Sequence, residues 1–173
     1  MTVLIEGISH ITSDRTILML LLVFGLAPFL DAVCGMSVGI FVIAPILLTL
    51  DIAPLLVACL CIISQVTSVW GTMGVVTLFA STITGLPATV IGSNSALLLM
   101  PATLNMCILA LLFTGRTRRE CLDAWVPVMG TAFILTGGAW IASRLVGVEL
   151  VGMLTSLSTI AFLALVGRLL ALQ

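Results

Sequence analysis

Charged residues are almost absent from this chain, and their scarcity decides what it can fold into. Only 8% of the 173 residues are charged, none is a lysine, and 61% are hydrophobic. Apolar residues run nearly end to end from Thr16 to Leu172, and charges interrupt them only at a few breaks. A water-soluble domain carries about 25% charged residues. We therefore predict a protein whose outer surface faces lipid.

The apolar segments are continuous, as in Ile17–Leu26 and Ala96–Phe113, whereas the strands of a membrane barrel alternate polar and apolar positions. The sequence thus predicts an all-α membrane protein. At about 20 residues per crossing, we expect about five to seven hydrophobic helices, several of them broken by Gly or Pro into half-helices or re-entrant segments. Residues 1–15 are predicted to form an amphipathic interfacial segment, and residues 16–173 a single polytopic transmembrane module.

Several function classes are disfavoured by the composition. The net charge of −1 gives no reason to expect a nucleic-acid partner. No cofactor or metal site is predicted, because Cys59 and Cys61 have no further cysteine or histidine nearby. The chain is not expected to be an enzyme, since its one histidine, His10, lies outside the apolar region and no lysine exists to activate a serine. An aspartyl protease would require Asp31 and Asp51 to face each other, and their surroundings match no known signature.

Gly- and Pro-containing breaks are the most informative local feature. Three of them, at residues 31–39, 51–54 and 84–87, cluster in the first ninety residues and leave apolar runs too short to cross a bilayer upright. Non-helical backbone persists in a membrane only where protein buries it or where it lines a wet cavity. Transporters build substrate sites from such half-helix ends. The alternative is that the prolines only kink continuous helices.

Asp31 is the acid most suited to chemistry, and Gly35 and Ser37 follow it in the first break. An ionisable group among apolar residues at membrane depth is functional by default. Because burial disfavours its charged form, Asp31 is predicted to bind a proton and to release it when the site opens to water. The alternative is that Asp31 lies at the membrane edge and caps the next half-helix. Asp51, which precedes Pro54, is better explained as such a cap.

Two polar clusters are candidates for lining a ligand site. The first is a stripe of small and hydroxyl side chains at helical spacing, with Gln65 beside it; its candidate ligand residues are Ser64, Gln65, Thr67, Ser68 and Thr72. The same stripe is equally typical of a close-packed helix pair. The second cluster, Gly92, Ser93 and Asn94, precedes the run predicted as a helix from Ala96 and would offer amides to an anion, or simply cap that helix.

The orientation follows from the charged loop at residues 115–123. Short arginine-rich loops stay in the cytoplasm, so Arg116, Arg118 and Arg119 are placed inside. Trp125–Ser143 is then predicted to cross outward and Leu150–Leu170 to cross back, which makes the C-terminus cytoplasmic.

Phe29-Leu-Asp31 and Gly35 match a Phe-Leu-Glu motif followed by glycines, and further positions match the same family in order and spacing. By these residues the sequence resembles the L-lactate permease family of bacterial carboxylate symporters. The other matching positions are Ile11-Thr-Ser-Asp14, Ala44-Pro-Ile-Leu-Leu, Pro54, Leu60-Cys61-Ile62, Gly71, Gly74, Thr84-Gly85, Gly92, Trp125, Pro127 and Gly147-Val-Glu-Leu150. Family members are much longer, and this chain is similar to one internal portion of their first half.

The resemblance implies import of lactate or a related small monocarboxylate with protons across the plasma (inner) membrane, with Asp31 in the place of the family's glutamate. The partners it implies are the lipid bilayer, a small carboxylate and protons, together with a second permease fragment or further copies of the chain. The alternative is a truncated or split-carrier membrane subunit without transport activity of its own.

Overall fold

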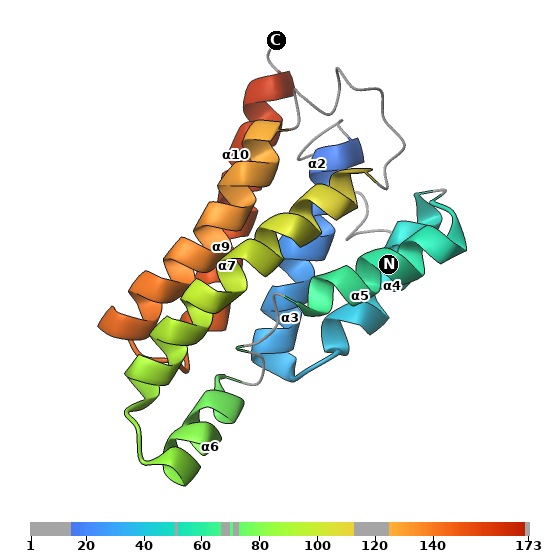
Figure 1. Cartoon of the computed structure of the whole chain (residues 1–173). Coiled ribbons are helices and arrows are strands. Elements are labelled where there is room, and N and C mark those ends of the chain that lie inside the picture. Colours follow the sequence, from blue (N-terminus) through green and yellow to red (C-terminus); the bar gives the residue numbers. More distant parts are fainter. Residues whose placement is uncertain (1–14, 51, 67–69, 71–72, 113–124, 172–173) are drawn as a thin grey trace.

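The computed structural model describes residues 15–50, 52–66, 70, 73–112 and 125–171 (Figure 1). Every regular element in these ranges is a helix, which confirms the all-α prediction. The elements are α2 (Arg15–Leu20), η1 (Leu21–Leu26), α3 (Ala27–Cys34), α4 (Val38–Thr49), α5 (Pro54–Gln65), α6 (Val75–Thr84), α7 (Ala88–Leu112), α9 (Trp125–Leu145) and α10 (Val151–Ala171).

The first three elements form one continuous helix, in which η1 is a stretch of π-helix between two α-helical pieces. The amide of Ala27 donates to the carbonyl of Leu22, five residues earlier, as in a π-helix. Together these elements form a stretch of 19 residues from Thr16 to Cys34 that is long and apolar enough to span a membrane. The prediction that this run is too short to cross is therefore wrong, because the helix continues through Asp31.

Four helices in the described ranges are long and apolar enough to cross a membrane: the Thr16–Cys34 helix, α7, α9 and α10. The three shorter ones, α4, α5 and α6, have 12, 12 and 10 residues. Twelve helical residues extend for only about 18 Å, against a hydrocarbon core of about 30 Å. The expected mixture of spanning helices and half-helices is thus present.

The long helices form the body of the molecule, and the short ones lie around it (Figure 1). α9 packs between α7 and α10, and α10 in turn packs along η1 and α3. α4 and α5 lie side by side against the Thr16–Cys34 helix, whereas α6 contacts mainly α7. The end of α3 is therefore where the body meets the short helices.

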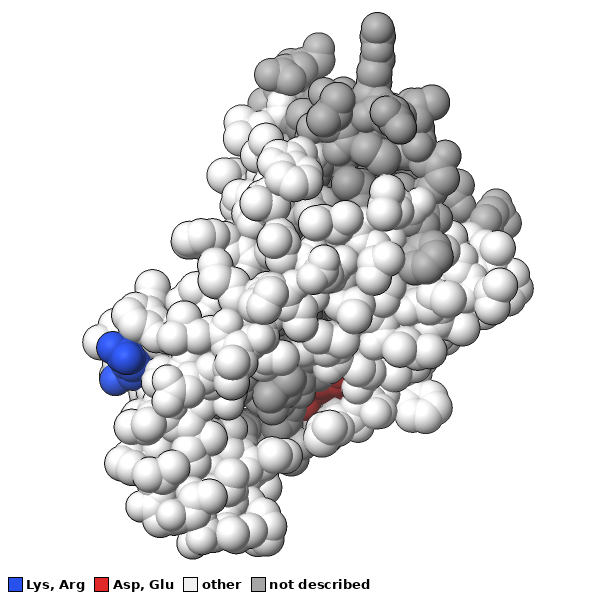
Figure 2. All heavy atoms as spheres, viewed as in Figure 1, with Lys and Arg blue, Asp and Glu red and all other residues white. Residues whose placement is uncertain are grey.

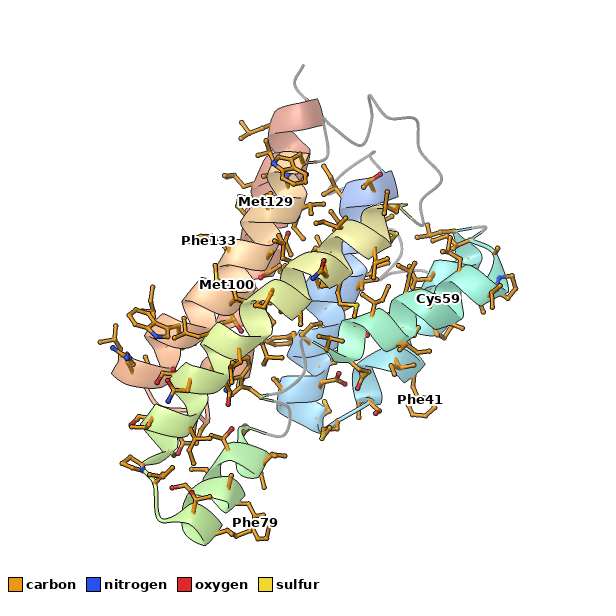
Figure 3. The ribbon with its side chains drawn as sticks, in the orientation of Figure 1. Phe41, Cys59, Phe79, Met100, Met129 and Phe133 are labelled. Atoms are coloured by element: carbon orange, nitrogen blue, oxygen red, sulfur yellow. The ribbon has the colours of Figure 1, made fainter. Side chains whose placement is uncertain are left out.

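The outer surface is apolar, as a lipid-facing surface must be. Phe41 and Phe79 project away from α4 and α6 in Figure 3 and are 79% and 65% exposed. Figure 2 shows a face on which basic residues occupy one small spot and acidic residues only a narrow recess. Large exposed hydrophobic side chains in this number destabilise a protein in water and suit a bilayer.

Candidate functional site

Asp31 lies in the last turn of α3, directly before the chain leaves the helix. Its side chain is completely buried. α3 ends at Cys34, and Gly35 has φ +118°, a conformation that side chains with a Cβ rarely adopt. Ser37, with φ 71°, is also left-handed, and α4 begins at the next residue. The break predicted at Asp31 therefore begins four residues later, and the carboxyl group sits beside it.

Donors from two other helices hold the carboxylate. Oδ1 of Asp31 accepts a hydrogen bond from the backbone amide of Gly39, at 2.7 Å, in the first turn of α4. Oδ2 accepts one from Nε2 of Gln65, at 3.0 Å, at the end of α5. The bond from Gly39 places the negative charge near the positive end of the α4 dipole. One side chain thus ties together α3, α4 and α5.

The approach of Gly39 to this carboxylate depends on the absence of a side chain. A Cβ at position 39 would lie 2.5 Å from the carbonyl oxygen of Ala27 and 2.8 Å from its Cα. These atoms belong to the backbone of α3 and cannot move aside as a side chain would. Glycine at position 39 therefore allows α4 to pack close enough to α3 for its amide to reach Asp31.

The segment around Trp70 covers the other side of the α3 end. The amide of Met73 donates to the carbonyl of Ala32 at 3.2 Å, and so satisfies one of the carbonyls that a helix end leaves without a partner. Gly152, at the start of α10, lies against both Ala32 and the carbonyl of Trp70, since a Cβ there would be 3.0 Å from each. The end of α3 is therefore contacted by Met73 and by Gly152 of α10.

The π-helix η1 lies one turn before this site and was not predicted from the sequence. π-helical turns occur rarely and often accompany functional sites. The residues of η1 are ordinary apolar ones with a single glycine, Gly25, and no local pattern distinguishes them from an α-helix. What distinguishes η1 from an ordinary apolar α-helix is its contact with α10, which only the tertiary structure shows.

Of the predicted hydroxyl stripe the structure describes only Ser64 and its neighbour Gln65, and the stripe as a ligand site stays a prediction. α5 ends at Gln65 and α6 begins at Val75, and Met73 and Gly74 between them are left-handed, which ends any continuous helix. Ser64 is buried on α5, where its hydroxyl donates to the carbonyl of Cys61. Gln65 is the stripe member brought to Asp31. Thr67, Ser68 and Thr72, together with Gly71, lie outside the described residues.

Gly92, Ser93 and Asn94 do not form a helix N-terminus either. α7 begins at Ala88, eight residues before the predicted start, so the amides of these residues lie inside the helix. Gly92 packs against Val148, Ser93 donates to the carbonyl of Val90, and Asn94 is exposed. The polar cluster is therefore an interior part of α7.

The crossings predicted for the C-terminal part are confirmed as helices, with α9 at Trp125–Leu145 and α10 at Val151–Ala171. The arginines of the predicted cytoplasmic loop, Arg116, Arg118 and Arg119, lie outside the described residues, as do Asp51 and the interfacial segment up to residue 14. Within the described ranges, no group of three or more histidine, cysteine or acidic side chains could hold a metal ion. Cys34, Cys59, Cys61 and Cys107 are free thiols.

The Asp31 arrangement can serve a carboxyl group in either protonation state. A carboxylate uses both donors as described, and its charge is partly offset by them. A protonated Asp31 still accepts from Gly39 on one oxygen, and its new O–H can donate to Gln65 if the amide of that residue rotates by 180° and presents Oε1.

Comparison with known proteins gives a consistent result. The sequence profile of the L-lactate permease family matches residues 1–171. L-lactate permease of Streptococcus iniae is 27% identical over 158 residues, which is 91% of this chain and 33% of that protein. L-lactate permease of Escherichia coli K12 is 29% identical over 163 residues, or 92% of this chain and 29% of that protein, and the Bacillus subtilis protein is 26% identical over 160 residues. No solved structure matches.

The chain spans about a third of the length of the curated relatives it matches. The match nevertheless extends over almost every residue of the chain, through the short helices, the Asp31 break and the long crossings alike. The chain is a helical membrane protein that belongs to the L-lactate permease family.

Proposed function

We propose that this chain forms part of a proton-coupled carrier for lactate or a related small monocarboxylate, and that Asp31 takes up the coupling proton. The observation that carries this proposal is the complete burial of Asp31 at a helix break, with donors from α4 and α5 on its two oxygens. Its support from comparison is that the similar proteins are named L-lactate permeases. An acid buried in a membrane protein without such a role is a costly feature.

Proton coupling in this proposal is a matter of charge balance. Two arginines have side chains that the structure describes, Arg144 and Arg168, and both are exposed. Within the described ranges, therefore, no buried cation is positioned to pair with a substrate carboxylate. A proton on Asp31 removes the negative charge that would repel an incoming anion. A neutral Asp31 keeps its bond to Gly39 but no longer offsets the positive end of the α4 dipole, which then favours an anion nearby. Release of the anion and of the proton together completes a symport cycle.

Asparagine at position 31 provides the decisive test, because its amide imitates the protonated carboxyl group. Asp31→Asn keeps an acceptor for Gly39 and a donor for Gln65 but cannot release a proton. In liposomes containing the purified chain, we expect the variant to lose lactate accumulation driven by a pH gradient. Glu149→Gln, which removes an exposed carboxylate from the turn between α9 and α10, is the matched control and should transport as the wild type does.

Equal pH-driven accumulation by Asp31→Asn and wild type would remove Asp31 from proton coupling. Retention of lactate exchange by the variant, without pH-driven accumulation, would assign the defect to the proton step and not to folding. The two measurements together separate loss of coupling from loss of the protein.

A second candidate function is a subunit of a split carrier that does not transport alone. The comparison that bears on it is that the matched region covers about a third of the length of these relatives. A wild-type chain that is silent in liposomes, but active when a second permease fragment is added, would support this alternative. A chain that transports alone would exclude it.

We also propose a plasma-membrane location with the loop at residues 115–123 and the C-terminus in the cytoplasm. The support is the arginine content of that loop, which contains Arg116, Arg118 and Arg119. Cys121 in the loop gives a direct test in a variant that lacks the other cysteines. A membrane-impermeant maleimide should label it in inverted vesicles and not in intact cells, and the reverse pattern would invert the topology.

A further inference from the structure

A small internal cavity lies beside the Asp31 site, between α7, α9, α10 and the segment that leads to α6. Its volume is about 10 Å³, measured for the centre of a water-sized sphere. This is close to the least space that holds one water molecule or one hydroxyl oxygen. The cavity is lined by Val66, Trp70, Leu99, Thr103, Leu135, Thr136 and Thr155.

Trp70 lines this cavity and carries a buried hydrogen-bond donor that is unused. Its side chain is 6% exposed, and its Nε1 is buried with no acceptor in the part of the chain that the structure describes. The indole N–H can only donate, so no rearrangement of its own satisfies it. A buried donor without a partner destabilises the fold by a full desolvation penalty. Because the cavity beside this indole has room for one oxygen atom, it can hold the acceptor that the N–H lacks.

The threonines that line the cavity provide hydrogen-bond acceptors. The hydroxyl of Thr136 donates its proton to the carbonyl of Ala132 at 2.7 Å, and that of Thr155 donates to Val151 at 2.8 Å. Each hydroxyl has one proton and two lone pairs, so both oxygens remain able to accept. Both side chains are buried, which keeps bulk water from supplying the missing donors.

One donor and two acceptors do not suit a carboxylate, whose oxygens only accept. They suit a neutral O–H group, which accepts one hydrogen bond and donates another. We infer that this cavity is a binding site for such a group, which accepts from Nε1 of Trp70 and donates to the hydroxyl oxygen of Thr136 or Thr155. Two sources share this chemistry: a water molecule and the hydroxyl group of a 2-hydroxy acid. The second source rests on the proposed function.

The position of the cavity connects it with the proton site. Met73, three residues after Trp70, donates to the carbonyl of Ala32, which follows Asp31 in α3. Gly152 lies against both Ala32 and Trp70, and Thr155 is one turn further along α10. Val66, which also lines the cavity, directly follows Gln65, so a hydroxyl group held by Trp70 and the threonines would lie close to the Asp31 site.

The test observes the indole N–H of Trp70 by NMR in the ¹⁵N-labelled full chain in micelles. The chain has three tryptophans, so Trp70→Phe assigns the resonance. Trp125→Phe combined with Trp140→Phe assigns it by elimination should the first variant fail to fold. Trp140 is the matched internal control, because its Nε1 is also buried and unpartnered but it does not line the cavity.

Without added ligand, we expect a magnetisation-transfer peak between bound water and Trp70, and none for Trp140. Lactate, unlike propionate, which lacks the hydroxyl group, should displace that water and shift the Trp70 resonance if the substrate hydroxyl is the occupant. Trp70→Phe should then weaken lactate binding about 2- to 10-fold and leave propionate binding unchanged. A water peak that persists with lactate identifies water as the occupant.

A Trp70 resonance with no water peak, and with the same shift in buffer, lactate and propionate, would overturn the inference. This outcome differs from failure of the proposed function. A chain that neither binds nor transports lactate still shows the water peak if the cavity binds an O–H group, whereas a transporting chain can lack it.

Discussion

Replacing Asp31 by alanine should destabilise the protein much more than replacing it by asparagine. In Asp31→Ala the buried amide of Gly39 loses its acceptor, and the half-buried amide of Gln65 loses its own. An unpartnered buried N–H costs about 1–3 kcal/mol, and a net hydrogen bond that water can partly replace about 0.5–1 kcal/mol. The expected loss is therefore about 1.5–4 kcal/mol. Asparagine restores both partners without the charge, so its loss should stay within about 1 kcal/mol.

The assay is equilibrium unfolding of the full chain in mixed micelles by titration with a denaturing detergent, followed by circular dichroism. Asp31→Asn and Asp31→Ala are compared at equal protein concentration, with Glu149→Gln as the exposed-carboxylate control. If Asp31→Ala unfolds within about 0.5 kcal/mol of wild type, the carboxylate does not hold the three helices together. If Asp31→Asn is as destabilising as Asp31→Ala, the hydrogen bonds from Gly39 and Gln65 do not account for the stabilisation by Asp31.

Three further outcomes are expected. Gly39→Ala should cost about 1–3 kcal/mol and exceed the cost of Gly130→Ala, because its Cβ meets the backbone of α3 whereas that of Gly130 meets only the ring tip of Phe162; equal costs in the unfolding titration would contradict this. In Gln65→Glu, the free energy of unfolding should fall as the pH rises, since two carboxylates about 3 Å apart cannot both ionise. A free energy of unfolding that does not change with pH would show that the side chain at position 65 does not contact Asp31. In single-cysteine variants, a membrane-permeant maleimide should modify the exposed thiol of Cys34 and not that of Cys107 before unfolding, as mass spectrometry can show; rapid modification of Cys107 would argue against the packing of α7.

The sequence predicted the C-terminal crossings almost to the residue, because charges bound them and their apolar runs are uninterrupted. α7 was misplaced at its start for a physical reason: Gly92, Ser93 and Asn94 resemble a cap. Inside α7, the glycine provides room for Val148 and the serine satisfies its own hydroxyl on a backbone carbonyl. Local polarity does not distinguish a cap from a polar patch that a neighbouring helix covers.

The candidate site was predictable only in part. Asp31 and its neighbouring break follow from an acid and two glycines in an apolar run. Gln65 was noted for its polarity, but its contact with Asp31 spans 34 positions and depends on how α4 and α5 turn back against α3. Trp70 and the threonines of the cavity were not singled out, since isolated hydroxyls are common in membrane helices. An unpartnered indole nitrogen on a residue that lines a cavity is what distinguishes them.

The π-helix η1 determines the direction in which the acid faces. In an α-helix one residue corresponds to about 100° of rotation, and a π-helical turn contains one residue more than an α-helical turn. Had Leu21–Leu26 been wound as an ordinary α-helix, the carboxyl group of Asp31 would be swung around the axis, away from Gly39 and Gln65 and toward a different neighbour. One extra residue in a helical turn that begins ten positions earlier thus decides whether this acid meets its two donors.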